Sequence, residues 1–251
     1  MTETRVDLHV KVLDERVVGR AKELGLDGLV YAPHFTRWPD ICERAGAFSD
    51  DELLVVPGRE LFTSDWRNRR HVLALDLEAS IPDFLTLEGT MAELARQDAV
   101  VLVPHPGFLT VSLHREDIER YRDQIDGVEV YNPKHLPRDN RRARQFAAEL
   151  DLPKFASSYA HLRQTVGEAW TTFETSIDSA ADLHAALRAG DRRDVGRREG
   201  LDHHVRCGLE FAHLGWENSW EKIDRLYLSG TEPTHPTHVA YDGRFDDVRV
   251  Y

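Results

Sequence analysis

Residues 100–106 read Val100-Val101-Leu102-Val103-Pro104-His105-Pro106, an unbroken apolar run that ends at a histidine between two prolines. An apolar run of this length is typical of a strand that is buried on both faces, as in a parallel sheet covered by helices. The stretch therefore predicts a central strand with a histidine just beyond its carboxyl end.

Strands and helices alternate along the first two thirds of the chain. One helical stripe is formed by Val17, Ala21 and Leu24, which stand at positions i, i+4 and i+7 before a stop at Gly25. Further helices are expected around residues 87–95, 118–125 and 143–150, and after a capping box at residues 179–182. The expected strands are residues 6–10, 28–32, 53–56, 71–75, 100–103, 128–131 and 154–157. This alternation predicts an α/β fold with a mostly parallel sheet, and the chain length suits a single α/β barrel.

The chain is expected to divide into a barrel domain, residues 1–193, and a tail, residues 194–251. A charged stretch at residues 191–199 lies between them. The tail begins with a helix, because its apolar residues have helical spacing, and continues as extended, turn-rich chain. We expect this helix to pack on the outside of the barrel, although Trp216 and Trp220 would also suit a docking surface. The apolar stripe of the tail helix consists of Val205, Leu209, Ala212 and Trp216.

The composition argues against several classes of protein. The formal charge of −12 disfavours stable binding to duplex nucleic acid. No apolar run approaches the roughly 18 residues that a membrane span requires, and the first ten residues do not resemble a secretory signal. Cys42 and Cys207 form no CxxC pair, so a disulfide framework or a cysteine zinc site is not expected. We expect a cytoplasmic protein without a membrane partner. The excess of acidic residues and the scarcity of lysine indicate a salt-adapted source, which loss of folding at low salt would test.

Six potential metal ligands fall at the predicted strand ends. Five of them lie at or just past the end of a strand, and one, His71, opens a strand. In a parallel barrel the strand ends meet on one face, where active sites are built. Histidine and glutamate without cysteine are ligands typical of zinc, manganese or iron. One such histidine alone is more often a loop residue, but six positions together favour a metal site. The six residues are His9, His34, Glu60, His71, His105 and His161.

The other eight histidines show no such regularity, and we interpret them as surface or packing residues. His135 is a weak exception, because it follows a predicted strand end and could line the mouth of the barrel.

Short strings of the chain, taken in order, resemble the motifs of the polymerase and histidinol phosphatase (PHP) family of metal-dependent phosphoesterases. The resemblance covers residues 5 to about 193. It implies a distorted seven-stranded (β/α) barrel with a C-terminal helical and extended tail. It also implies a cleft for up to three divalent metals, which would activate water and stabilise charge on a phosphoester. The strings are Asp7-Leu8-His9-Val10-Lys11, Ala21–Gly28 followed by His34, Pro57-Gly58-Arg59-Glu60, His71–Leu75, Val103–Pro106, Gly127–Asn132, Ser157–His161, Val166-Gly167, Thr172-Phe173 and the helix Asp182–Gly190.

Several motif positions depart from the family pattern. Lys11 stands where the resemblance implies a second histidine, and Pro33 and Tyr159 stand where it implies aspartates. A protonated lysine cannot ligate a metal, but its charge can replace that of a cation beside Glu60. The resemblance thus implies one complete metal set, Glu60 with His71 and His105. It also implies a weaker second position at His34 and His161, and a third replaced by Lys11.

Three functions remain open. The first is a metal-dependent phosphoesterase that uses metal-activated water, with one or two zinc, manganese or iron ions, on a small phosphorylated metabolite or nucleotide. In it, Glu60 would orient the metal, and Lys11, Arg59 or Arg37 would hold phosphate oxygens. The second is a catalytically degenerate barrel that serves as a binding or assembly module. The third is a hydrolase of non-phosphate esters or amides. Retention of the complete metal set favours an enzyme.

Overall fold

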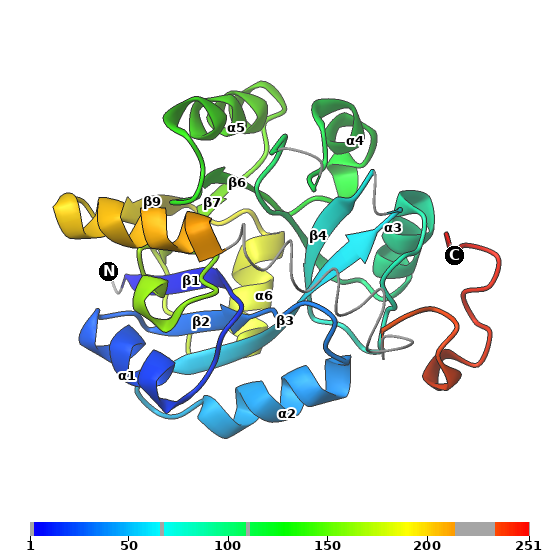
Figure 1. Cartoon of the computed structure of the whole chain (residues 1–251), viewed down its shortest axis with the longest axis horizontal. Helices are drawn as coiled ribbons and strands as arrows, with labels where there is room; N and C mark the ends of the chain where they lie inside the picture. Colours follow the sequence, from blue (N-terminus) through cyan, green and yellow to red (C-terminus); the bar gives the residue numbers. More distant parts are fainter. Residues whose placement is uncertain (1–2, 66–67, 109–110, 214–233, 251) are drawn as a thin grey trace.

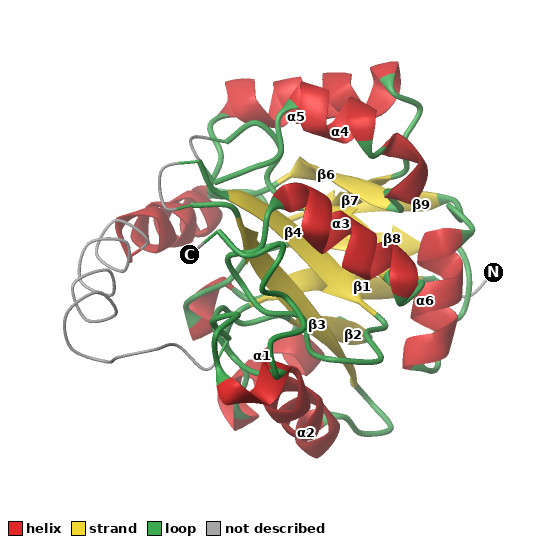
Figure 2. Cartoon of the chain, turned by 90° about the vertical axis from the view of Figure 1, so that its right-hand side faces the viewer, coloured by secondary structure: helices red, strands yellow, loops and turns green. Residues whose placement is uncertain are grey.

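The structure is a computed structural model that describes residues 3–65, 68–108, 111–213 and 234–250. Nine strands in these residues form one sheet in the order β7-β6-β5-β4-β3-β2-β1-β8-β9. Helices α1 and α2 cover one side of the strands and α4 and α5 cover the opposite side (Figures 1 and 2). The strands are β1 (Thr4–Val10), β2 (Gly28–Tyr31), β3 (Leu54–Thr63), β4 (Arg70–Leu75), β5 (Val100–Val103), β6 (Gly127–Tyr131), β7 (Lys154–Ala156), β8 (Ala169–Phe173) and β9 (Arg193–Arg197). The helices are α1 (Glu15–Glu23), α2 (Trp38–Phe48), α3 (Leu87–Arg96), α4 (Arg115–Arg120), α5 (Pro137–Glu149) and α6 (Ala180–Arg188), with a further helix over residues 201–213.

The mixed α/β barrel confirms the predicted fold class, and the strand directions correct it in detail. Strands β1, β2 and β3 are parallel to one another, as are β5, β6 and β7. Strand β4, however, is antiparallel to both β3 and β5, and β8 and β9 add two further antiparallel pairs. The sheet is therefore less parallel than expected. Helix α2 and strands β8 and β9 were not predicted as elements. For α2 the reason is that it buries only Ile41 and Ala45, which gives a weak periodic signal.

The barrel is nearly closed by contacts between its first and last parallel strands. Val10 at the end of β1 forms a parallel bridge with Ala160, and the Lys11 N–H donates to the Ala160 carbonyl at 2.8 Å. The Thr171 hydroxyl of β8 bonds to both backbone groups of Ala156 in β7, at 3.0 Å to the nitrogen and 2.9 Å to the oxygen. These bonds hold the end of β1 beside the segment that follows β7.

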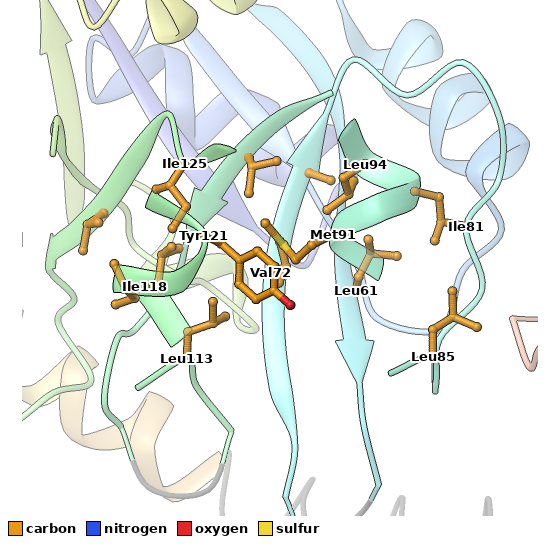
Figure 3. Close-up of a cluster of buried hydrophobic side chains, with 14 of the residues drawn as sticks. Leu61, Val72, Ile81, Leu85, Met91, Leu94, Leu113, Ile118, Tyr121 and Ile125 are labelled. Atoms are coloured by element: carbon orange, nitrogen blue, oxygen red, sulfur yellow. The ribbon is translucent and has the colours of Figure 1, made fainter. Parts of the chain in front are cut away.

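The outer hydrophobic cluster, which includes Leu61, Val72, Met91 and Leu94, determines which strand side chains face the inside of the barrel. Figure 3 shows Met91 and Leu94 of α3 near Leu61 of β3 and Val72 of β4, and all four belong to one buried cluster. Burial of each such side chain stabilises the fold by about 1.5–3 kcal/mol. Because successive side chains of a strand point to opposite faces, this packing turns the neighbouring Glu60 toward the barrel interior.

The sheet of the barrel continues past the expected boundary between barrel and tail. Strand β9 lies across the expected boundary at residues 193 and 194 and pairs with β8. The helix over residues 201–213 buries His203 and Glu210, whereas Val205 and Leu209 are 53% and 58% exposed. The described residues of its apolar stripe therefore lie at the surface, whereas we expected the stripe to pack on the barrel. Trp216 and Trp220 lie outside the described residues.

Residues 234–250 are turn-rich, as predicted, and they pack on the barrel near α3. Tyr241 and Phe245 belong to the outer hydrophobic cluster, and the Val248 carbonyl accepts a bond from the Thr86 N–H at 2.8 Å. None of the helices in the described part of the chain has both the length and the apolar character that crossing a membrane demands.

The closing bonds of Thr171 can be tested by substitution with valine, which keeps the shape and removes the hydroxyl. Thr171→Val leaves a buried N–H and C=O of Ala156 without that partner, so we expect the free energy of unfolding to fall by about 1–3 kcal/mol. Thr172→Val, on the half-buried face of the same strand, should change it by less than about 0.5 kcal/mol. Urea unfolding of both variants measures the difference, and equal effects would contradict the role of this hydroxyl in closure.

Candidate metal centre

The six predicted ligands meet at one rim of the barrel. His34, His105 and His161 follow β2, β5 and β7, and His9 is the penultimate residue of β1. Glu60 was expected just past a strand end but lies inside β3, which continues to Thr63 by pairing with β4. His71 opens a strand and still reaches the same rim, because β4 runs antiparallel to its neighbours.

The fully buried carboxylate of Glu60 is the centre of this group. Its Oε1 lies 3.0 Å from His71 Nδ1 and 2.9 Å from His105 Nε2. Its Oε2 lies 3.2 Å from His34 Nε2 and 3.4 Å from His9 Nε2. His161 lies beside the group, with its ring centroid 6.1 Å from that of His34. The structure thus brings together all six residues that the sequence singled out.

Three of these residues have the geometry of a metal site. Glu60, His71 and His105 each offer one ligand atom, and the three atoms lie within 4.8 Å of one another. His71 Nε2 and both ring nitrogens of His9 are buried without a hydrogen-bond partner among the described residues. A buried polar atom without a partner is costly, and a cation would supply one. The residues therefore fit a divalent metal ion, whereas the choice among zinc, manganese and iron stays a prediction.

The charges of the site are those that a metal requires. Burial, reinforced by the charge of Lys11, lowers the pKa of His9 to about 3 and that of His34 well below its usual value. Burial also lowers the pKa of His105. Burial opposes ionisation of Glu60, but the nearby Lys11 ammonium and the histidines hold the pKa of this carboxyl well below its usual range. Neutral imidazoles and an ionised carboxylate are the forms that ligate metals.

Lys11 lies directly against the carboxylate. Its Nζ pairs with Glu60 Oε2, donates to the Ala32 carbonyl at 2.6 Å, and lies 5.5 Å from the centroid of the Tyr159 ring. Burial lowers the pKa of Lys11 to about 8 against the opposing effect of Glu60. The Lys11 ammonium therefore offsets the negative charge of Glu60. It does so at the position where the resemblance to the PHP motifs implies a histidine.

The two arginines considered as phosphate-binding residues both have carboxylate partners. Arg59 is 1% exposed, pairs with Asp83 at 2.5 Å and donates to the backbone carbonyl of Glu60 at 2.8 Å. This arrangement supports the strand segment that carries Glu60. Arg37 lies at the surface and pairs with Asp40 at 2.9 Å. A role of either arginine toward a substrate stays a prediction.

Glu129 of β6 is a buried acid that the sequence analysis did not single out. It accepts a bond from the backbone N–H of His105 at 2.6 Å and another from the Ser157 hydroxyl at 2.5 Å. Burial raises the pKa of Glu129 to about 7, against the effect of these bonds. It thus holds the segment that carries His105. A charged residue in the middle of an otherwise apolar strand was the signal that could have found it.

Lys134 and Glu210 were also missed, and both lie buried beside His161. Lys134 Nζ is 3.0 Å from Glu210 Oε1, and Glu210 also accepts a bond from the His161 N–H at 2.6 Å. Hydrogen bonds from His161 and Thr165, together with the charge of Lys134, lower the pKa of Glu210 to about 2 despite its burial. Nothing in the spacing of the tail indicated that its helix would bring an acid to this rim.

A cavity of about 980 Å³ lies next to the metal centre, because Lys11, which pairs with Glu60, is among its lining residues. His161, Tyr31, Phe48 and Arg163 also line it. It lies between α2 and the segment that follows β7, and its volume is that of sites for small molecules.

Comparison with known proteins gives one match in sequence. The PHP-associated family, PHP_C, matches residues 137–191, which include α5, β7 and α6. No protein with a curated function matches the chain in sequence.

Several solved structures share the fold at low sequence identity. PsfC from Pseudomonas syringae PB-5123 is 21% identical, with a TM-score of 0.62, and the match covers 85% of this chain and 100% of PsfC. An amidohydrolase from Chromobacterium violaceum with bound sulfate and no metal is 14% identical, with a TM-score of 0.55 over 76% of this chain and 97% of the other. A lesion-specific endonuclease from Pyrococcus furiosus is 15% identical, with a TM-score of 0.54 over 77% of this chain and 58% of the endonuclease.

These likenesses, at identities below a quarter, concern the fold. The barrel carries the predicted motifs in their expected order, and the sequence match falls on its last parallel strand and the helices on either side. The chain is thus similar in sequence to the PHP-associated family over residues 137–191.

Proposed function

We propose that this chain is a metal-dependent hydrolase that acts on phosphoesters of small molecules. The observation that carries the proposal is the buried cluster of Glu60, His71 and His105, whose ligand atoms lie within 4.8 Å of one another at the rim of the barrel. A divalent cation held there would supply Lewis acidity, which polarises a phosphoryl oxygen and lowers the pKa of water.

The residues around the cluster have separate roles in this proposal. Glu60 fixes the orientation of His71 and His105 through its Oε1 and holds Lys11 through its Oε2. Glu129 fixes the backbone of His105. Lys11 lines the cavity, so its ammonium is positioned to bind an oxygen of the phosphoryl group and offset the negative charge that develops there.

The size and charge of the molecule favour a small phosphorylated metabolite or nucleotide as substrate. A cavity of about 980 Å³ accommodates such a molecule. The formal charge of −12 opposes the approach of a long polyanion such as duplex DNA. A cytoplasmic location is consistent with such a substrate and stays a prediction.

Two alternatives remain distinguishable from this proposal. A catalytically degenerate barrel that serves as a binding or assembly module would not require a metal. A hydrolase of carboxylic esters or amides would require the metal but release no phosphate. A substrate screen of the metal-loaded protein that includes phosphomonoesters, phosphodiesters, esters and amides separates the two enzymatic functions.

Removal of the predicted ligands should abolish metal binding. We expect the purified protein, incubated with manganese or zinc and passed through a desalting column, to retain about one ion or more per chain. His105→Ala and Glu60→Gln should retain less than a tenth of that amount, because each removes one of three ligands. Elemental analysis measures the content, and circular dichroism checks that the variants fold.

The matched control is His204→Ala, which removes an exposed histidine of the tail helix. It should keep the metal content of the unaltered protein. Absence of metal from the unaltered protein, or equal loss in the control, would contradict the proposed metal centre and favour the binding module.

Metal binding should also stabilise the fold. A ligand that binds only the folded state at 100 times its Kd stabilises it by about 2.7 kcal/mol. For a chain of this size that corresponds to a rise in melting temperature of about 5–10 °C. Differential scanning fluorimetry with manganese, zinc or EDTA measures the shift. Glu60→Gln should show almost none, and a shift in this variant as large as in the unaltered protein would place the binding elsewhere.

A further inference from the structure

The ammonium group of Lys134 lies among groups that could ligate a cation. Its Nζ is 2.6 Å from His161 Nδ1 and 3.0 Å from Glu210 Oε1, and it donates to the Tyr159 carbonyl oxygen. The side chain is 1% exposed. An imidazole nitrogen, a carboxylate oxygen and a carbonyl oxygen are ordinary ligands of divalent metals.

Lys11 also lies near the Tyr159 ring and among oxygen atoms. Its Nζ pairs with Glu60 Oε2 and the Ala32 carbonyl. The two ammonium groups lie 5.5 Å and 4.0 Å from the centroid of the Tyr159 ring, Lys134 being the nearer. The π-system of the Tyr159 ring favours neighbouring cations.

From these contacts we infer that Lys11 and Lys134 are built-in cations that occupy the positions of further metal ions, so that the centre holds one divalent ion per chain. This inference rests on the proposed metal centre and specifies its stoichiometry. The single ion is held by Glu60, His71 and His105, and the second position expected from His34 and His161 is not formed.

The contacts of Nδ1 withdraw this nitrogen of His161 from metal binding. A lysine ammonium has N–H donors and no acceptor, and it lies 2.6 Å from Nδ1, where a cation bound to this nitrogen would otherwise lie. The same Nδ1 lies 3.0 Å from the Tyr159 carbonyl oxygen and 3.3 Å from Glu210 Oε1. With Lys134 in place, this nitrogen therefore contacts the ammonium and two oxygens instead of a metal ion.

Glu210 stabilises this arrangement from the tail helix. Its carboxylate pairs with Lys134 and accepts bonds from the backbone N–H groups of His161 and Leu162, at 2.6 and 3.2 Å, and from the Thr165 hydroxyl at 2.5 Å. These contacts fix both the lysine and the backbone of His161. The helix over residues 201–213 therefore contributes a positioning residue to the centre through its polar face.

Metal stoichiometry tests the inference. Equilibrium dialysis against saturating manganese, followed by elemental analysis, should give one ion per chain in the unaltered protein. Lys134→Met keeps the volume and removes the ammonium, so His161 and Glu210 become available and the content should rise to two. Lys134→Arg, which keeps a cation, and Lys154→Met, which changes an exposed lysine, should both remain at one.

The electron paramagnetic resonance spectrum of the unaltered protein gives a second readout that does not depend on a variant folding. One manganese ion gives a six-line spectrum without the spin coupling of a metal pair. Two or more ions in the unaltered protein, or a coupled spectrum, would overturn the inference, as would one ion in a folded Lys134→Met variant. Absence of any ion from the unaltered protein would instead overturn the proposed function.

Discussion

The structure of this rim depends on the buried negative charge of Glu60. Moving a carboxylate out of water costs several kcal/mol, which only close positive or hydrogen-bonding partners can offset. Here Lys11 offsets the charge at one oxygen, and His71 and His105 contact the other. The same geometry leaves a carboxylate and two imidazoles converging on one point, which is the requirement for a bound cation. The compensation of one buried charge and the capacity to bind metal are therefore two consequences of one arrangement.

The barrel delivers this arrangement through strand direction and packing. Leu61 and Val72 lie in the outer hydrophobic cluster, so Glu60 faces inward. The antiparallel direction of β4 brings the first residues of that strand to the rim where the parallel strands end. The near-closure of the barrel at Val10 and Ala160 places Lys11 beside the segment that carries Tyr159 and His161. Residues from most of the barrel and from the tail helix thus contribute to one site.

The sequence predicted those parts of the site that depend on strand ends. His34 and His105 follow apolar runs and His161 follows the short strand predicted at residues 154–157, and such strands predict both burial and a common rim. The position of Glu60 inside a strand was not predictable, because it depends on pairing between β3 and β4 and not on local propensity. Glu210 could not be assigned, since helical spacing marks the apolar face of the tail helix as the buried one and the structure buries the polar face. That reversal is a tertiary effect, because the buried Glu210 has hydrogen-bond and ion-pair partners at Lys134, His161, Leu162 and Thr165.

Anomalous X-ray diffraction at the absorption edge of manganese or zinc, from crystals grown with that metal, tests the central claim most directly. We expect a single strong anomalous peak within about 2.0–2.3 Å of a Glu60 carboxylate oxygen and of one ring nitrogen each of His71 and His105. Loss of the direct contacts between Glu60 Oε1 and the two histidines should accompany it. An anomalous peak elsewhere, with these three side chains still bonded to one another, would contradict the account.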